Sequence, residues 1–137
     1  VDLLSSEHED ALLISYQPHG TLGDEEMKVK VEDGRVVDIS KQMDPAEADG
    51  ENVGIVKFGP AGATLLIEKM NELVAAGNRK AWAPRAFREF AAVRPLRAIS
   101  TNDYPWIEID FPEDYARAVE EIVPELATDG ALTAALR

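Results

Sequence analysis

Two carboxylates lie at the end of a short apolar segment, where an α/β protein commonly binds its ligand. Glu108 and Asp110 belong to the run Trp106–Asp110, whose composition predicts a strand over residues 105–110. Pro112 suits the first position of a following helix, and the acidic residues after it complement the helix dipole. Ligands of open α/β sheets bind just outside the carboxyl ends of strands, so Asp110 is a candidate for chemistry. The alternative is a plain strand-to-helix turn in which Asp110 caps the helix or forms a salt bridge.

Four segments in order resemble one family of enzymes. They are Glu25-Glu-Met-Lys-Val29, Ile39-Ser-Lys41, Gly50-Glu-Asn-Val-Gly-Ile55 and Trp106-Ile-Glu-Ile-Asp-Phe-Pro-Glu-Asp-Tyr115. Together they resemble the nucleotidyltransferases that join a nucleoside triphosphate to a phosphorylated sugar, polyol or amino-alcohol, across roughly residues 10–123. The family's Gly-rich nucleotide loop and first metal aspartate would precede Val1, so we expect the acceptor-side, C-terminal half of such an enzyme.

The resemblance implies a Mg²⁺ site at Asp110. Mg²⁺ prefers carboxylate and phosphate oxygens and usually takes only one or two protein carboxylates. The ion would bridge phosphate oxygens while the acceptor phosphate attacks the α-phosphorus. Glu108, two residues earlier on the same strand face, would be a supporting partner of the site.

The same resemblance assigns the acceptor site to the middle of the chain. Lys28 and Lys41 would hold the acceptor phosphate as point charges, the alternative being solvated surface lysines. Glu51 would accept hydroxyl or amine hydrogen bonds and Gly54 would permit close approach, the alternative being a loop acid and a glycine at a β-bulge. Trp106 would pack beneath the acceptor or stack on an amine or sugar ring.

Composition limits the partners. The chain has 137 residues, net charge −12 and no cysteine, which excludes disulfides, thiolate metal sites and cysteine nucleophiles. An acidic surface repels nucleic acids and anionic membranes, and no apolar run has the length of a membrane span. His8 and His19 are too few and too far apart for a zinc site. We therefore expect a single cytoplasmic domain over residues 1–137.

The elements that must position these residues alternate between strands and helices. Strands are predicted over residues 11–16, 53–58 and 96–101, and Asp33-Gly34 predicts a hairpin between residues 27–32 and 36–41. Helices are predicted from Pro60 to a cap at Gly77, over residues 79–93 with a break near Pro84, and over residues 112–123 with an end at Pro124. The order predicts a mixed, mostly parallel α/β sheet flanked by helices, a Rossmann-like nucleotidyltransferase half. Its exposed edge would favour a homodimer or strand exchange.

Two functions follow as expectations. The first is Mg²⁺-dependent nucleotidyl transfer, with CTP favoured as donor and pyrophosphate as product. The phosphate nucleophile is already ionised, so positioning and metal electrostatics would supply the rate. The alternative is a non-catalytic module of the same ancestry that binds a phosphorylated metabolite or regulates a partner. A coincidental α/β domain would leave Lys28, Lys41 and Asp110 dispersed.

Overall fold

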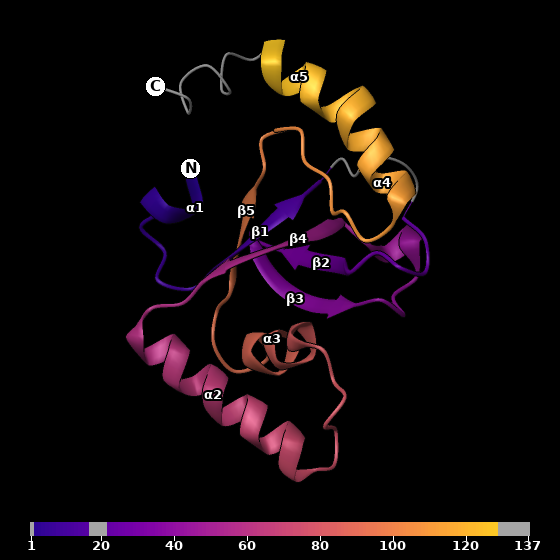
Figure 1. The fold of residues 1–137 in the computed structure, drawn as a ribbon. Coiled ribbons are helices and arrows are strands. Elements are labelled where there is room, and N and C mark those ends of the chain that lie inside the picture. The colour runs from indigo at the N-terminus through magenta and orange to yellow at the C-terminus, as the bar shows by residue number, and fades with distance from the viewer. Residues whose placement is uncertain (1, 17–21, 129–137) are drawn as a thin grey trace. The chain divides into compact units, whose positions relative to one another are not determined.

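The computed structural model describes residues 2–16 and 22–128, and the chain divides into two compact units, Val1–Asn102 and Asp103–Arg137. The first unit holds all five strands and the helices α1 (Asp2–Ser5), α2 (Pro60–Ala75) and α3 (Ala83–Ala91) (Figure 1). None of the helices in the described ranges has the length and apolar character that crossing a bilayer requires.

The five strands form a closed barrel, so the prediction of a Rossmann-like sheet is wrong. The barrel order is β1-β4-β2-β3-β5, closed by β5 against β1. Only the β1–β5 pair is parallel, whereas a Rossmann-like sheet is mostly parallel with helices on both faces. Closure leaves none of the five described strands at an edge, and the expected homodimer or strand exchange stays a prediction. The strands are β1 (Ala11–Ser15), β2 (Lys28–Glu32), β3 (Arg35–Ser40), β4 (Gly50–Lys57) and β5 (Arg97–Ser100).

The predicted hairpin is confirmed. Asp33 and Gly34 have φ values of 48° and 71°, which suits the two-residue turn that matches the right-handed twist of the flanking strands. Val29 and Ile39 are paired across the hairpin and are both buried, so this face of β2 and β3 joins the core. Lys28 and Ser40 therefore lie on the opposite face, because side chains alternate along a strand.

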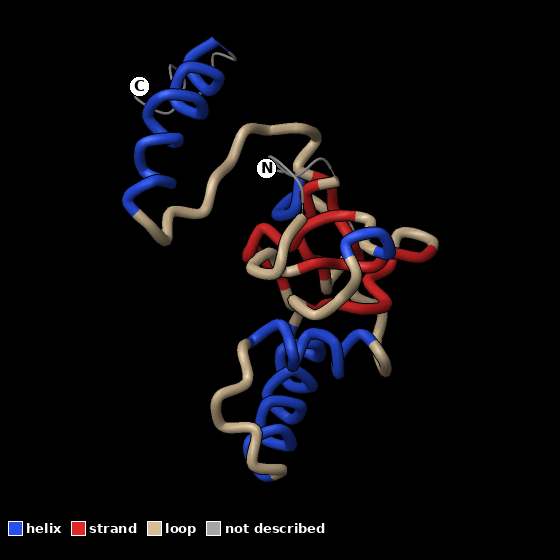
Figure 2. The backbone as a smooth tube through the Cα atoms, turned by 90° about the vertical axis from the view of Figure 1, so that its right-hand side faces the viewer, coloured by secondary structure: helices blue, strands red, loops and turns tan. Residues whose placement is uncertain are grey.

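Helix α3 lies between the barrel and α2, and the two helices sit on one side of the strands (Figure 2). Phe87 and Phe90 of α3 join the core, where the Phe90 ring meets Phe58 edge-on at 5.0 Å between centroids. The expected break near Pro84 is instead the helix start, since Pro84 suits the first turn where no N–H is needed. The core residues are Leu12, Ile14, Val29, Val36, Ile39, Phe87, Phe90 and Leu96.

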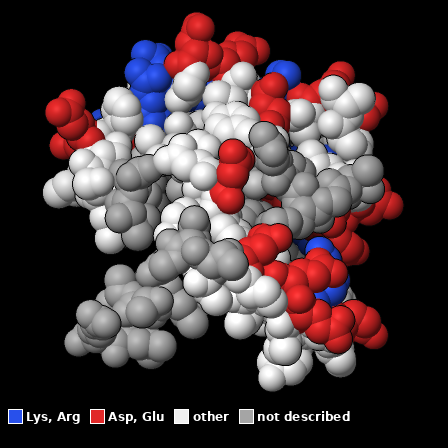
Figure 3. All heavy atoms as spheres, turned by 90° about the horizontal axis from the view of Figure 1, so that it is seen from above, with Lys and Arg blue, Asp and Glu red and all other residues white. Residues whose placement is uncertain are grey.

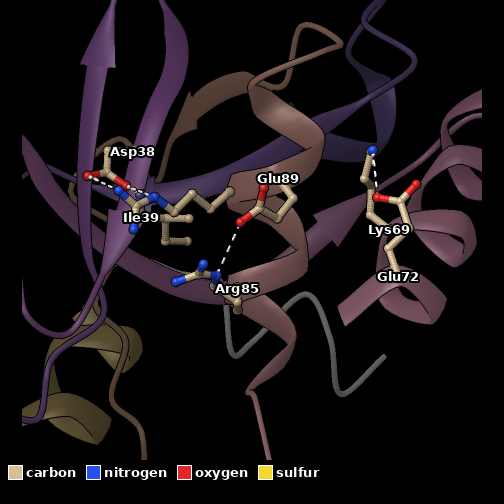
Figure 4. Close-up of polar contacts among 7 residues, drawn as sticks. Asp38, Ile39, Lys69, Glu72, Arg85 and Glu89 are labelled. Carbon is tan, nitrogen blue, oxygen red and sulfur yellow. Dashed lines mark hydrogen bonds and ion pairs between the residues drawn. The ribbon is translucent and has the colours of Figure 1, made fainter. Parts of the chain in front are cut away.

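Ion pairs lie within α3 and between the α3 region and the strands or the residues next to them. The guanidinium of Arg88 lies 2.8 Å from Asp38 on β3, and Arg85 pairs with Glu89 one turn along α3 (Figure 4). A deeper pair joins Arg94 to Asp10, a residue that is only 4% exposed and whose carboxylate also accepts the backbone N–H of Gly59. Elsewhere acidic side chains prevail, as on the face in Figure 3, where Asp and Glu exceed Lys and Arg.

The second unit corrects two further predictions. Residues 105–110 form no strand, so Asp110 does not end one. The helix from Pro112 continues through Pro124 in three parts: α4 (Pro112–Arg117), the π-helical turn η2 (Ala118–Ile122) and α5 (Val123–Thr128). A proline lacks an N–H and clashes with the carbonyl four residues before it, and the wider π turn just before Pro124 accommodates it.

Candidate functional site

Strand register brings Lys28 and Glu51 together. Lys28 on β2 is directly opposite both Ser40 on β3 and Glu51 on β4. Glu51 is in turn opposite Ser15 on β1. Directly opposite residues of antiparallel strands share a face, so these four side chains form one row across four adjacent strands. We call Ser15, Glu51, Lys28 and Ser40 the Lys28 row; it spans roughly 14 Å, three strand spacings of about 4.8 Å.

Lys28 lies at the buried centre of this row. Its residue exposure is only 1%, and its ammonium group donates to the carbonyl oxygens of Gly23 (2.5 Å) and Glu26 (3.2 Å). The Glu26 carboxylate accepts the N–H of Gly23, which closes this loop on itself. The alternative of a solvated surface lysine is therefore wrong for Lys28. In this structure Lys28 fixes the loop beside the row.

Lys41 is the accessible cation of the site. It follows the last residue of β3, so it adjoins Ser40 at one end of the Lys28 row. Its ammonium lies 3.1 Å from the Glu25 carboxylate and 4.4 Å from the centre of the Trp82 ring. The side chain of Glu25 is 87% exposed, so the pair is open to competition from another anion.

Gly54 marks a bulge in β4. Its φ of +82° is in the left-handed region that favours glycine, and its N–H donates to the side-chain oxygen of Asn52. Between Leu12 and Ile14 of β1, the partner position on β4 moves from Val56 to Asn52, so β4 carries extra residues there. The bulge interpretation of Gly54 is therefore confirmed. Space is open where a Cβ would stand, so close approach by a ligand stays a prediction.

Tyr16 and Asp49 lie close to the row in sequence. Tyr16 directly follows Ser15 at the end of β1, and Asp49 directly precedes β4, two residues before Glu51. Partial burial raises the pKa of the Tyr16 hydroxyl above its usual 10.0, and the negative charge of Asp49 raises it further. Asp49 itself accepts the N–H of Val31 (2.7 Å) and pairs with Lys30 (3.2 Å). Lys30 is thus a partly exposed, ion-paired lysine beside the row.

The predicted metal residues belong to the second unit and are not brought to the Lys28 row by any strand pairing. Glu108 and Asp110 are exposed, and Asp110 donates its backbone N–H to Asp114. Asp114, not Asp110, caps the start of α4 by also accepting the N–H of Phe111. Trp106 is half-buried, and its indole nitrogen has no hydrogen-bond partner among the described residues.

Within residues 2–16 and 22–128 there is no group of three or more His, Asp or Glu side chains that could hold a metal ion. Exposed carboxylates are nevertheless the donor type that Mg²⁺ prefers, and one or two of them suffice. The donors therefore fit in kind, and Asp110 with Glu108 stays a prediction. His8 is exposed, and His19 lies outside the described residues.

Three further residues of the site were not predicted from the sequence: Trp82, Glu25 and Ser15. Trp82 was predicted within a helix, but it stands just before α3 and is 65% exposed. The Trp-Ala-Pro order was an available signal, since Pro84 favours the first helical turn and so leaves Trp82 outside the helix. Ser15 gave no signal, because its place in the row depends on pairing with a distant strand.

Comparisons with known proteins do not assign the chain to a family. The chain matches no protein-family model and no curated protein. The function is therefore argued from the residues of the site.

Proposed function

We propose that the outer face of the barrel binds a phosphorylated sugar, polyol or amino-alcohol and serves nucleotidyl transfer to it. The donor is a nucleoside triphosphate, with CTP favoured, and pyrophosphate is released in a Mg²⁺-dependent reaction. The observation that supports this is the register that places Glu51 opposite Lys28, with Lys41 adjoining the same row.

Each residue has a separate task in this proposal. Lys41 exchanges the exposed Glu25 carboxylate for the acceptor phosphate, because a phosphate carries more charge than a carboxylate. Glu51 accepts hydrogen bonds from a hydroxyl or amine of the acceptor. Lys28 keeps its bonds to Gly23 and Glu26 and holds the loop in place, so it acts as a positioning residue.

Mg²⁺, once bound, would neutralise the phosphate charge during transfer, and Asp110 with Glu108 would hold it. Replacing Asp110 by Asn removes the negative charge with little change in size. In a complete enzyme, pyrophosphate release from Mg-CTP in the presence of an acceptor should then be abolished. Full activity in this variant would exclude Asp110 as a metal ligand.

Acceptor binding is tested by calorimetry with choline phosphate, glycerol 3-phosphate and glucose 1-phosphate. Lys41→Ala and Glu51→Gln should each weaken binding at least about tenfold, the effect of losing one hydrogen bond to a charged group. Lys30→Ala removes an equal charge from a neighbouring position of β2 and is the matched control. An equal loss in Lys30→Ala, or no binding of any acceptor, would overturn the proposal. Binding of an acceptor while Mg-CTP and Mg-GTP both fail to bind would instead support the non-catalytic module.

A further inference from the structure

The segment from the end of α2 into α3 is cationic in a strongly acidic chain. The sixteen residues 73–88 contain no Asp or Glu but include Arg79, Lys80, Arg85 and Arg88. The whole chain has 26 acidic and 14 basic residues, so this segment carries the opposite sign from the rest. A charge reversal of this kind on an exposed connection attracts anions locally.

An exposed tryptophan lies among these basic residues in the sequence, and one further lysine contacts its ring. Trp82 is 65% exposed, and Lys41 reaches it from the end of β3. Arg79 and Lys80 precede it in the connection, and Arg85 follows it in the first turn of α3. We call Lys41, Arg79, Lys80, Trp82 and Arg85 the Trp82 patch.

The charge of this patch is only partly compensated. Lys41 pairs with Glu25 and Arg85 with Glu89. Arg79 and Lys80 are exposed, and no described residue forms an ion pair with either. The first turn of α3 contains no acidic residue, so the positive end of its dipole adds to the field of these side chains. Two cations beside an aromatic ring are thus available to a ligand.

We propose that the Trp82 patch binds a small phosphate ester that carries an aromatic ring. The phosphate lies between Arg79 and Lys80, which supply charge-assisted donors, and the ring rests on Trp82. The ligand is small because a longer polyanion would extend from the patch over the acidic remainder of the chain and be repelled. The patch shares Lys41 with the proposed acceptor site, but Arg79, Lys80 and Trp82, which would bind this ligand, have no task in acceptor binding.

Tryptophan fluorescence tests the proposal directly. The chain has two tryptophans, so Trp106→Phe leaves Trp82 as the only reporter. In this background, phenyl phosphate and adenosine monophosphate should quench Trp82 fluorescence, and inorganic phosphate should bind at least about tenfold more weakly because it has no ring. Phenyl phosphate and the nucleotide together show whether a simple aromatic ester suffices or a nucleobase is needed.

Charge variants locate the binding. Arg79→Ala with Lys80→Ala should weaken phenyl phosphate binding about tenfold or more, because both phosphate donors are lost. The control is the double variant Lys30→Ala with Lys69→Ala, which also removes two positive charges, but from ion pairs outside the patch. Calorimetry on Trp82→Leu should show a comparable loss. Glu51→Gln, which should weaken acceptor binding in the proposed function, should leave phenyl phosphate binding unchanged, so the two proposals fail separately.

Three results would overturn this inference. They are no binding of phenyl phosphate or the nucleotide, an equal loss in the control double variant, and inorganic phosphate binding as tightly as phenyl phosphate.

Discussion

Replacing Asp10 by Asn should destabilise the first unit far more than replacing a partly exposed aspartate that also pairs with an arginine. Asp10 precedes β1, is 4% exposed and holds two other elements. One oxygen accepts the N–H of Gly59 at the start of α2 (3.0 Å), and the other accepts from Arg94, beyond the end of α3 (2.6 Å). The same bond raises the pKa of Arg94, so this guanidinium stays charged at any pH at which the protein folds.

The magnitude follows from what Asn keeps and what it loses. The amide oxygen of Asn can still accept from Gly59, so the support of α2 remains. The bond from Arg94 is lost, and an NH₂ group faces the guanidinium in its place. A hydrogen bond to a charged group contributes about 1.5–3 kcal/mol, and we expect Asp10→Asn to lower the free energy of unfolding by that amount.

Asp38→Asn is the matched control, because Asp38 also pairs with an arginine of the α3 region. Its side chain and that of Arg88 are 34% and 43% exposed, so this pair should contribute only about 0–1 kcal/mol. Urea unfolding followed by circular dichroism gives both values, provided that the slope m is unchanged. Equal losses for the two variants would refute the argument that burial of Asp10 sets its contribution.

Two further predictions concern single residues of the first unit. Gly62→Ala should lower the free energy of unfolding by about 3 kcal/mol, because the new Cβ would stand 1.9 Å from a carboxylate oxygen of Asp10. Gly77→Ala, where the Cβ meets open space but φ is +88°, should lower it by about 1 kcal/mol. Urea unfolding that ranks the two variants the other way would contradict the steric argument. Absorbance titration should place the pKa of Tyr16 above 10.0 and show it falling in Asp49→Asn, since one negative neighbour is gone. A raised pKa means that the folded state holds the proton more tightly, so this contribution to stability is complete below pH 10.0 and is lost as the pH rises through the folded-state pKa. An unchanged pKa in Asp49→Asn would exclude the charge effect.

Local signals predicted most of the elements. The turn residues Asp33-Gly34 predicted the hairpin, and the apolar run from Ala11 predicted a strand, whose residues are all buried. Gly77 was predicted to cap α2, and it follows the helix with φ +88°. Each of these features depends on a few neighbouring residues, so sequence alone contains the information.

One failure occurs where structure depends on a distant partner, and another where an adjacent turn departs from the usual helix geometry. Residues 105–110 have the composition of a strand, but a strand needs a neighbour, and no described strand pairs with this segment. Pro124 should end a helix by the usual rule. It does not, because the preceding π turn changes which carbonyl faces the proline ring.

The site shows the same division between local and distant information. Glu51 and Lys28 were predicted separately, and no property of either strand indicates that the two residues are opposite each other. Their pairing requires β4 to lie between β1 and β2, although β3 separates β2 from β4 in sequence. The register within that arrangement places Glu51 between Ser15 and Lys28. Barrel closure therefore disproves the expected sheet and at the same time builds the row on which the proposed acceptor site depends.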